Sequence, residues 1–166
     1  MNAYLTSGTL DYLLQVSNDN PGAHTFIMGD ETNTVVYHES KHASIFAEPR
    51  GFEIIVEKGQ LKDYGFVVMN NIPVTDEGKP IFETQFKQRA GLIEGTPGFH
   101  ALRVLRPTRG NTYVVMVQWQ DKQSYDSWKN SDSFQKSHAG KNKKEKPPYA
   151  AGPSYVTSYK MIELDE

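Results

Sequence analysis

Apolar and polar residues alternate regularly through the C-terminal part of the chain, and this pattern predicts a run of strands and helices. In chain order the predicted elements are a strand (65–74), a helix (80–95), two strands joined by the turn at residues 108–111 (99–107 and 111–120), a helix (122–140) and a final strand (154–164). Strand-helix-strand-strand-helix-strand is the order of the ferredoxin-like fold. We therefore predict an α+β, ferredoxin-like domain over residues 64–166.

Residues 1–63 show a fainter version of the same order. Its predicted elements are a short strand (3–8), a short helix (9–19), a hairpin (24–30 and 33–40), one helical turn (41–50) and a strand (51–59). The chain thus reads as two tandem βαββαβ-type halves, of which the N-terminal one is degenerate, although no sequence repeat accompanies the repeated order. Two four-stranded sheets packed face to face into a barrel-like sandwich would bury more apolar surface than one small sheet.

Composition and charge narrow the class of protein. A net charge of −2 argues against a nucleic-acid partner, because phosphate binding needs a basic face. The absence of cysteine excludes disulfides, thiolate metal sites and cysteine nucleophiles. No apolar stretch approaches the roughly 20 residues that span a bilayer, and the N-terminus lacks the basic start of a secretory signal, so no membrane partner and a cytoplasmic location are expected.

One polar residue interrupts an apolar face of the strand at residues 65–74. Alternate residues of a strand point to the same side, so Asn70 shares a face with the apolar residues between Phe66 and Val74. An unpaired buried amide costs about 1–3 kcal/mol, so Asn70 needs a hydrogen-bond partner. That partner is either a neighbouring backbone group, which makes Asn70 a core residue, or a bound ligand.

Histidines and tryptophans supply the other candidates for ligand binding. The five histidines are His24, His38, His42, His100 and His138. None lies in an HExxH motif or a Cys/His cluster, so a structural zinc site is not expected. His138 follows Trp128 by ten residues in an aromatic-rich predicted helix, where a histidine is either a surface residue or a ligand. Trp128 is either a core residue packed on Tyr125 or part of a binding pocket.

The sequence lacks the motifs of several other kinds of binding site. The sequence has no GxSxG, P-loop or GxGxxG pattern, so a bound flavin or nucleotide has no support. The lysines between Lys141 and Lys146 form either a solvated loop or a flap that offers cations to an anionic ligand.

The segment SWKNSDSFQKSHAG, which contains Trp128 and His138, follows a βαββ unit whose first strand carries Asn70. In these features the chain resembles the Isd-type haem-degrading monooxygenases of the antibiotic-biosynthesis-monooxygenase superfamily, which have the ferredoxin-like fold. Its length, with the additional N-terminal half, is similar to that of the two-domain HmoB type of Gram-positive bacteria. The resemblance covers residues 65–163 and implies that the C-terminal half is the monooxygenase domain.

The resemblance also implies a role for five residues. The neutral imidazole of His138 binds the iron of haem, and the amide of Asn70 donates a hydrogen bond to the oxygen ligand on the open face. Trp128 presses the porphyrin out of plane, while Phe86 and Arg89 of the first helix line the haem. Haem is then both cofactor and substrate, and O2 with electrons from an external donor or reductase opens its ring to release iron and a bilin-type product.

Two features bear on this assignment. Pro73, close after Asn70, departs from the family pattern and fits a strand end or an edge. Ten residues of unbroken α-helix rise about 15 Å, which would keep Trp128 and His138 from meeting at the centre of one porphyrin. Residues 130–133 (NSDS) are helix-cap formers, so we predict that the helix breaks or bends there.

Two rival functions stay open. One is a cofactor-free oxygenase of the same superfamily that acts on an aromatic quinol, and the other is a haem-binding or haem-carrying protein without turnover. Because the N-terminal half could supply the second sheet within the same chain, we predict a monomer that acts as a pseudo-dimer.

Overall fold

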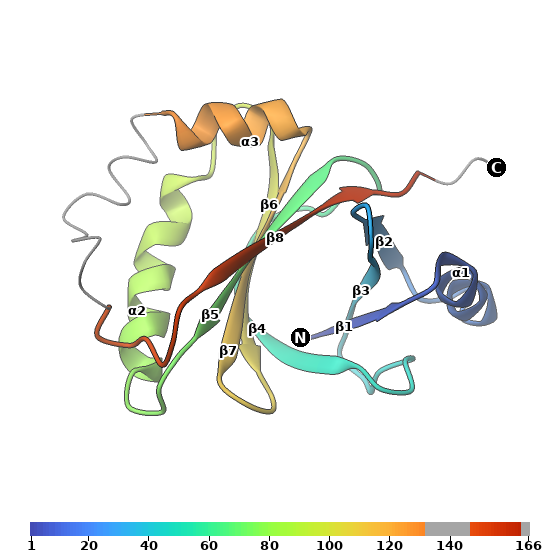
Figure 1. Ribbon diagram of the computed structural model, residues 1–166, viewed down its shortest axis with the longest axis horizontal. Helices are drawn as coiled ribbons and strands as arrows, with labels where there is room; N and C mark the ends of the chain where they lie inside the picture. The colour runs from blue at the N-terminus through green and yellow to red at the C-terminus, as the bar shows by residue number, and fades with distance from the viewer. Residues whose placement is uncertain (132–146, 164–166) are drawn as a thin grey trace.

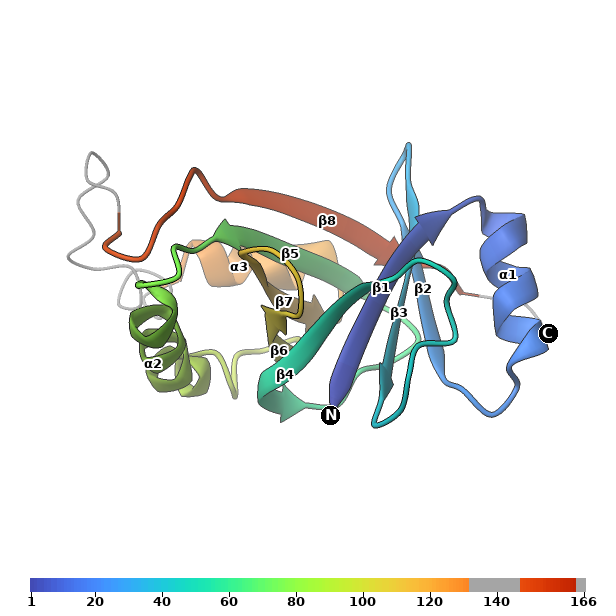
Figure 2. The same ribbon diagram turned by 90° about the horizontal axis from the view of Figure 1, so that it is seen from below.

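The computed structural model of the protein describes residues 1–131 and 147–163. Its strands close into a barrel, with two helices of the C-terminal half at one end of the molecule and the N-terminal helix at the other (Figure 1, Figure 2). Among these described residues, no helix is long and apolar enough to cross a membrane.

The N-terminal half follows the predicted order except in one segment. It contains β1 (Asn2–Gly8), α1 (Leu10–Asp19), β2 (Thr25–Gly29), β3 (Thr34–Ser40) and β4 (Arg50–Gly59). The helical turn predicted at residues 41–50 is wrong, because the side chains of Ser40 and Ser44 accept hydrogen bonds of 2.9 Å from the backbone N–H groups of His42 and Phe46. Such local bonds offer the backbone an alternative to a helix.

The C-terminal half confirms the predicted ferredoxin-like order. It contains β5 (Phe66–Pro73), α2 (Lys79–Arg89), the 3-10 turn η1 (Ala90–Leu92), β6 (Phe99–Pro107), β7 (Thr112–Trp119), α3 (Lys122–Lys129) and β8 (Tyr155–Met161). The predicted hairpin is the pair β6–β7, whose turn contains Gly110 at φ +79°, a conformation that glycine adopts without strain.

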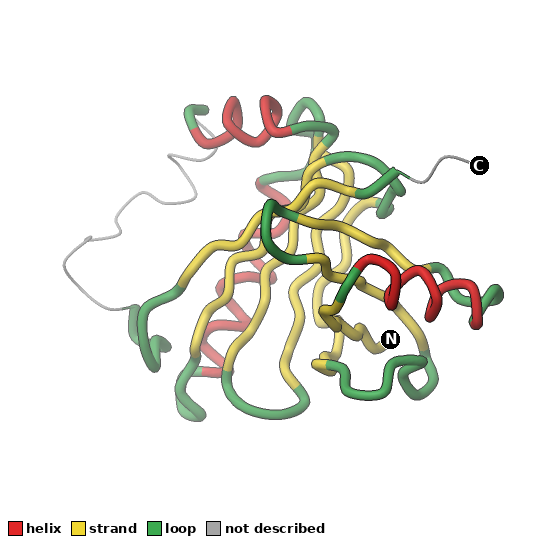
Figure 3. The backbone as a smooth tube through the Cα atoms, turned by 45° about the vertical axis from the view of Figure 1, so that its right-hand side comes forward, coloured by secondary structure: helices red, strands yellow, loops and turns green. Residues whose placement is uncertain are grey.

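The eight strands of the described residues, drawn in yellow in Figure 3, belong to one closed barrel. Their order around the barrel is β1-β3-β2-β8-β5-β7-β6-β4. The prediction of two sheets packed face to face is therefore corrected, because strands of the two halves pair edge to edge. The junction between β4 and β6 contains seven residue pairs, whereas the junction between β2 and β8 contains two. Within each half the strand order is the same, β4-β1-β3-β2 in the first and β8-β5-β7-β6 in the second.

Apolar side chains fill the barrel and also pack outside it. Alternate residues of β5, such as Val67 and Met69, point into the barrel together with residues of both halves. The intervening residues, such as Phe66 and Val68, belong to a second cluster under α2 and α3. A third, smaller cluster lies around Leu13 of α1. The two sides of β5 thus serve different purposes, and the outer side is the one that two helices cover.

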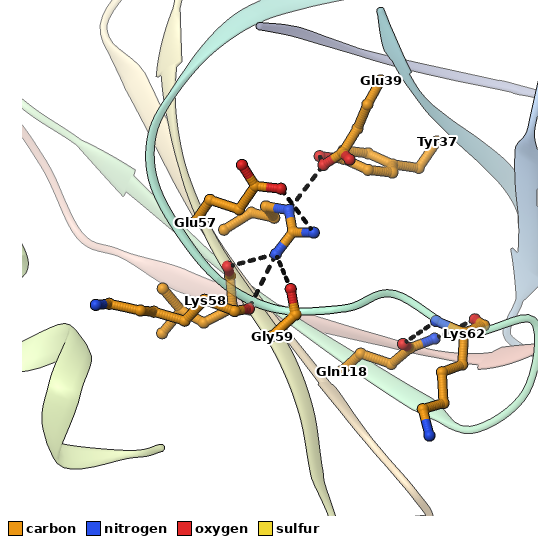
Figure 4. Close-up of polar contacts among 9 residues, drawn as sticks. Tyr37, Glu39, Glu57, Lys58, Gly59, Lys62 and Gln118 are labelled. Atoms are coloured by element: carbon orange, nitrogen blue, oxygen red, sulfur yellow. Dashed lines mark hydrogen bonds and ion pairs between the residues drawn. The ribbon is translucent and has the colours of Figure 1, made fainter.

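A buried arginine joins strands that are not neighbours in the barrel. The side chain of Arg103 on β6 is 3% exposed, and its Nε donates to Glu39 of β3 at 2.8 Å. Its Nη1 donates to the carbonyl of Lys58 at 3.0 Å, and its Nη2 lies 3.3 Å from Glu57 (Figure 4). The hydroxyl of Tyr37 also donates to Glu39, at 2.7 Å, and burial raises the pKa of Tyr37 well above its ordinary value. This network connects the two halves across one end of the barrel.

Candidate functional site

Two consecutive asparagines of β5 have opposite environments. Asn71 points into the barrel, is 3% exposed, and its amide donates to the carbonyls of Met69 and Tyr155 and to the hydroxyl of Thr157, at 3.2–3.3 Å. Asn70 points to the outer face, where its Oδ1 is buried and has no hydrogen-bond partner in the described part of the chain. The description of a core asparagine bonded to nearby backbone therefore fits Asn71, and the Asn70 amide is left for a ligand or water.

The α3 helix provides one wall beside this face. Asp121 caps its start by accepting a 2.8 Å hydrogen bond from the backbone N–H of Ser124. Trp128 is half-buried, and its ring centroid lies 5.5 Å from that of Trp119 on β7 and 6.4 Å from that of Tyr125. These tilted ring contacts attach α3 to the sheet, and Trp128 remains partly exposed.

The end of α3 confirms that the predicted helix does not continue unbroken. It ends at Lys129, and the side-chain amide of Asn130 donates to the carbonyl of Asp126 at 3.0 Å. Residues 132–146 lie outside the described residues, so the positions of His138 and of the lysines at 141–146 do too. The roles assigned to them stay predictions.

The α2 helix provides the second wall. Phe82 is fully buried and stacks on Phe86 at 4.4 Å between ring centroids, while Phe86 is half-buried against the outer cluster. The guanidinium of Arg89 lies 5.6 Å from the centre of the Phe86 ring. The two predicted lining residues, Phe86 and Arg89, are thus in contact with one another on the wall that faces the sheet.

The last strand borders the site and is largely uncovered on this face. In the pairing of β5 with β8, Asn70 lies opposite Val156, whose exposed fraction is 58%. Ser158 and Lys160 follow on the same side of β8 and are also exposed, and the strand runs along the margin of the molecule (Figure 2). Among the described residues, α2 and α3 cover β5 and β7 but not β8, so a ligand can approach Asn70 from this side.

A carboxylate connects the α2 wall to the sheet. Glu83 on α2 accepts a 2.5 Å hydrogen bond from the hydroxyl of Tyr113 on β7 and is paired in a bidentate manner with Arg106 on β6, at 2.9 and 2.5 Å. Arg106 also donates to Glu53 on β4 at 2.8 Å. The guanidinium of Arg106 lowers the pKa of Glu83, and burial with the Glu83 hydrogen bond raises the pKa of Tyr113. Glu83 is therefore ionised and Tyr113 protonated at neutral pH.

The histidines of the described residues lie away from this face or have other contacts. His38 is buried in the N-terminal half, with its Nδ1 3.0 Å from the carbonyl of His24. His100 lies beside Tyr64, and burial lowers its pKa. Within residues 1–131 and 147–163, no three His, Cys, Asp or Glu side chains are grouped to hold a metal ion.

Two parts of this site were not predicted from the sequence. The strip of Val156, Ser158 and Lys160 was visible as alternation in the last predicted strand, and its position opposite Asn70 needed the strand register. Nothing in the sequence indicated that Glu83 belongs to the site, because a glutamate on an amphipathic helix usually lies on the solvated face.

The comparisons with known proteins agree with this architecture. Residues 65–140 match the family model described as antibiotic biosynthesis monooxygenase, which confirms the predicted superfamily. A heme-degrading monooxygenase of Listeria monocytogenes is 28% identical over 129 residues, which are 77% of each chain. The solved structure of a major regulator of staphylococcal pathogenesis has the same fold, with a TM-score of 0.87 and 23% identity over 98% of this chain and 100% of that one.

A further relative shows the family of the whole chain. The signal transduction protein TRAP of Staphylococcus aureus (strain bovine RF122 / ET3-1) is 30% identical over 138 residues, which are 83% of this chain and 82% of that protein. The match therefore extends well beyond the monooxygenase region. The chain belongs to the family of the staphylococcal TRAP proteins, and the antibiotic biosynthesis monooxygenase model matches its residues 65–140.

Proposed function

We propose that the protein is a haem-degrading monooxygenase whose site lies on the outer face of β5, between α2, α3 and β8. The observation that carries this proposal is the buried Oδ1 of Asn70, which has no hydrogen-bond partner among the described residues and interrupts an otherwise apolar face. A buried polar group without a partner costs about 1–3 kcal/mol, and a hydrogen bond to a bound ligand would remove that cost. The printed name of the Listeria relative supports haem as the substrate.

The residues of the face fit the chemistry of haem. A porphyrin is a flat apolar ring with a polar centre, and the face offers aromatic walls on α2 and α3 around one amide. Rotation of the Asn70 side-chain amide by about 180° exchanges the positions of its oxygen and its NH2 group at little steric cost. Asn70 can therefore present a hydrogen-bond donor when a ligand requires one. In this proposal His138 binds the iron, which makes haem the metal-bearing substrate of the site.

Each remaining residue has a proposed task. The Asn70 amide donates a hydrogen bond where negative charge develops during attack on the ring, Trp128 presses on the ring to distort it, and Phe86 and Arg89 contact its edge. O2 supplies the oxygen atoms that open the ring, electrons come from an external donor or reductase, and iron and a bilin-type product leave.

The domain organisation is part of the same proposal. We assign residues 1–63 to a degenerate ferredoxin-like half and residues 64–166 to the monooxygenase domain, supported by the equal strand order of the two halves. The first half then takes the place that a second subunit would occupy in the barrel, so we expect a monomer that acts as a pseudo-dimer of the HmoB type. A cytoplasmic location stays a prediction.

Two other functions would use the same fold. One is haem binding without turnover; the name of the S. aureus relative, a signal transduction protein, favours a role other than catalysis but does not mention haem. A cofactor-free oxygenase acting on an aromatic quinol would bind no iron. Adding haemin and then a reductant, while the visible spectrum is followed, separates all three, because each predicts a different combination of binding and ring degradation.

Replacement of Asn70 by alanine tests the proposed catalytic role of its amide. The side chain would contact the reacting group and not the iron, so Asn70→Ala should bind haemin nearly as the parent does. Loss of a charge-stabilising donor typically costs about 100- to 1000-fold in rate, so absorbance decay at the Soret band with ascorbate should slow by that factor. Equal decay rates for Asn70→Ala and the parent would show that the proposed mechanism is wrong.

Asn71→Ala is the matched control, because it removes the same side chain one residue further along the strand. It leaves the barrel-side partners of Asn71 without their donor, so it should lower the free energy of unfolding by about 1–3 kcal/mol. Its rate of haem degradation at a temperature where it is folded should equal that of the parent. If Asn71→Ala slowed haem degradation as much as Asn70→Ala does, the effect would come from a disturbed strand and not from the outer face.

A further inference from the structure

We propose that Glu83 is a positioning residue that fixes the α2 wall of the site and links it, through Arg106, to the N-terminal half. This inference rests on the proposed function, since it concerns the wall formed by Phe86 and Arg89. Glu83 itself does not reach the substrate. It acts through the orientation of its helix.

The attachment of α2 to the sheet depends on few side chains. Phe82 is the one residue of this helix that is buried, and the Gly78 cap makes no side-chain hydrogen bond at the helix start. The apolar contacts of Phe82 and of the half-buried Phe86 still allow the helix to roll about its axis, because apolar packing is not directional. Glu83, the next residue, adds directional bonds to the hydroxyl of Tyr113 and to the guanidinium of Arg106.

Helix geometry transmits this constraint to the site. Phe86 follows Glu83 by three residues, so the two side chains lie on neighbouring positions of the helix surface. Tyr113, which donates to Glu83, lies opposite Ile72 of β5, two residues from Asn70 and on the same face of the sheet. The bonds of Glu83 therefore set the position of Phe86 relative to the strand that carries Asn70.

Arg106 extends the connection beyond the domain. Its Nε and Nη2 bind Glu83 and its Nη1 binds Glu53 of β4, so one guanidinium is shared by carboxylates of both halves. The side chain of Glu83 is 15% exposed and that of Glu53 is 57% exposed. An exposed ion pair contributes little, so most of the constraint comes from Glu83 and a smaller part from the N-terminal half.

The barrel contains a matched control for this cluster. Glu39 also accepts a hydrogen bond from a buried tyrosine, Tyr37, and also pairs with a guanidinium, that of Arg103. It lies on β3 inside the barrel, away from α2. Glu39→Gln and Glu83→Gln therefore remove the same kind of charge from the same kind of cluster, and only the second touches the helix wall.

The experiment compares these two variants in the full chain by amide hydrogen exchange without haemin and by haemin titration and turnover. Glu83→Gln should speed exchange selectively in residues 79–92. It should also raise the haemin dissociation constant and the KM about 5- to 10-fold while kcat stays within about twofold, because a displaced wall weakens ground state and transition state alike. Glu39→Gln should lower the unfolding temperature without changing either α2 exchange or haemin affinity.

Arg106→Lys provides a second test if Glu83→Gln folds poorly, because lysine keeps the charge and loses the bidentate fork. It should reproduce the KM increase. Unchanged exchange in α2 for both variants would overturn the positioning role, and faster exchange with unaltered haemin affinity would overturn its link to the site. A parent protein that neither binds nor degrades haemin would contradict the proposed function alone, while the exchange data would still decide the role of Glu83.

Discussion

The outer faces of the two halves differ although their strands follow the same order. In the N-terminal half, Leu13 of α1 and Phe46 of the segment before β4 close the face, and both are almost fully buried. Its polar groups have partners, since the hydroxyl of Tyr4 donates to the carbonyl of His42 at 2.8 Å and His38 lies 3.0 Å from the carbonyl of His24. In the C-terminal half the Asn70 amide has no partner in the described residues.

The two halves share one strand order, so the difference between the packed face and the candidate site lies in the segments that connect the strands. The segment between β3 and β4 lies where the other half has α3, and it brings Phe46 onto the face. In the C-terminal half, the described residues leave Val156 of β8 exposed beside Asn70. The strand order is therefore compatible with both outcomes, and the connections decide which face stays open.

The strongest test of the difference concerns iron binding. Loss of an outer-shell partner of a metal ligand costs about 10- to 100-fold in affinity, so loss of the ligand itself in His138→Ala should cost more and should abolish the ligated spectrum. His38→Ala, which alters the closed face, should bind haemin with an unchanged spectrum, as should the corresponding variants of His24, His42 and His100. A Soret band in His138→Ala like that of the parent would contradict the assignment.

The second test separates stability from binding. Leu13 is 1% exposed, and truncation of a buried leucine to alanine costs about 2–5 kcal/mol, so Leu13→Ala should lower the free energy of unfolding in urea by that amount. Because the residue belongs to the closed face, the folded fraction should bind and degrade haemin as the parent does. A loss of affinity greater than the unfolded fraction explains would show that the two faces are coupled.

The smallest effect is expected at the open border of the site. Val156→Glu places a charge on an exposed side chain opposite Asn70, so stability should change by less than about 0.5 kcal/mol. Full burial of a valine contributes about 1.5 kcal/mol, or slightly more than tenfold in affinity, so loss of a valine that the ligand covers only in part should lower haemin affinity about three- to tenfold. Tyr155→Glu is the control, because Tyr155 is 54% exposed and points to the other side of β8. Equal affinities for the two variants would place the ligand elsewhere.

The sequence predicted the elements better than their assembly. Alternation and turn residues are local properties, so the strands around Asn70 and the hairpin of β6 and β7 could be located from the chain alone. Closure of the barrel depends on pairing between β4 and β6 and between β2 and β8, which are remote in sequence and leave no periodic signal. The helical turn predicted at residues 41–50 does not form, because hydrogen bonds to serine side chains compete with the helix. Helix propensity alone does not account for such bonds.

The candidate site was predictable in part for a similar reason. Asn70 stood out because it interrupts an apolar face, and the structure adds that its oxygen is without a partner in the described residues. The choice of Asn70 over Asn71 rested on strand alternation together with the resemblance to the family, which carries an asparagine on its first strand. Glu83 escaped notice because its importance comes from Tyr113 and Arg106, which reach it from two other strands.

The two-pair junction between β2 and β8 has a consequence for how the protein is made. β8, the strand that completes the barrel, follows the seven other strands of the barrel in the chain and therefore leaves the ribosome after them. Until then one edge of β2 lacks its neighbour, and an unpaired strand edge is a template for association with other chains. Domains fold from the N-terminus during synthesis at about 5–20 residues per second, so the newly made first half spends several seconds with this edge open. The shortness of β2, five residues, limits how much of that edge another chain can pair with.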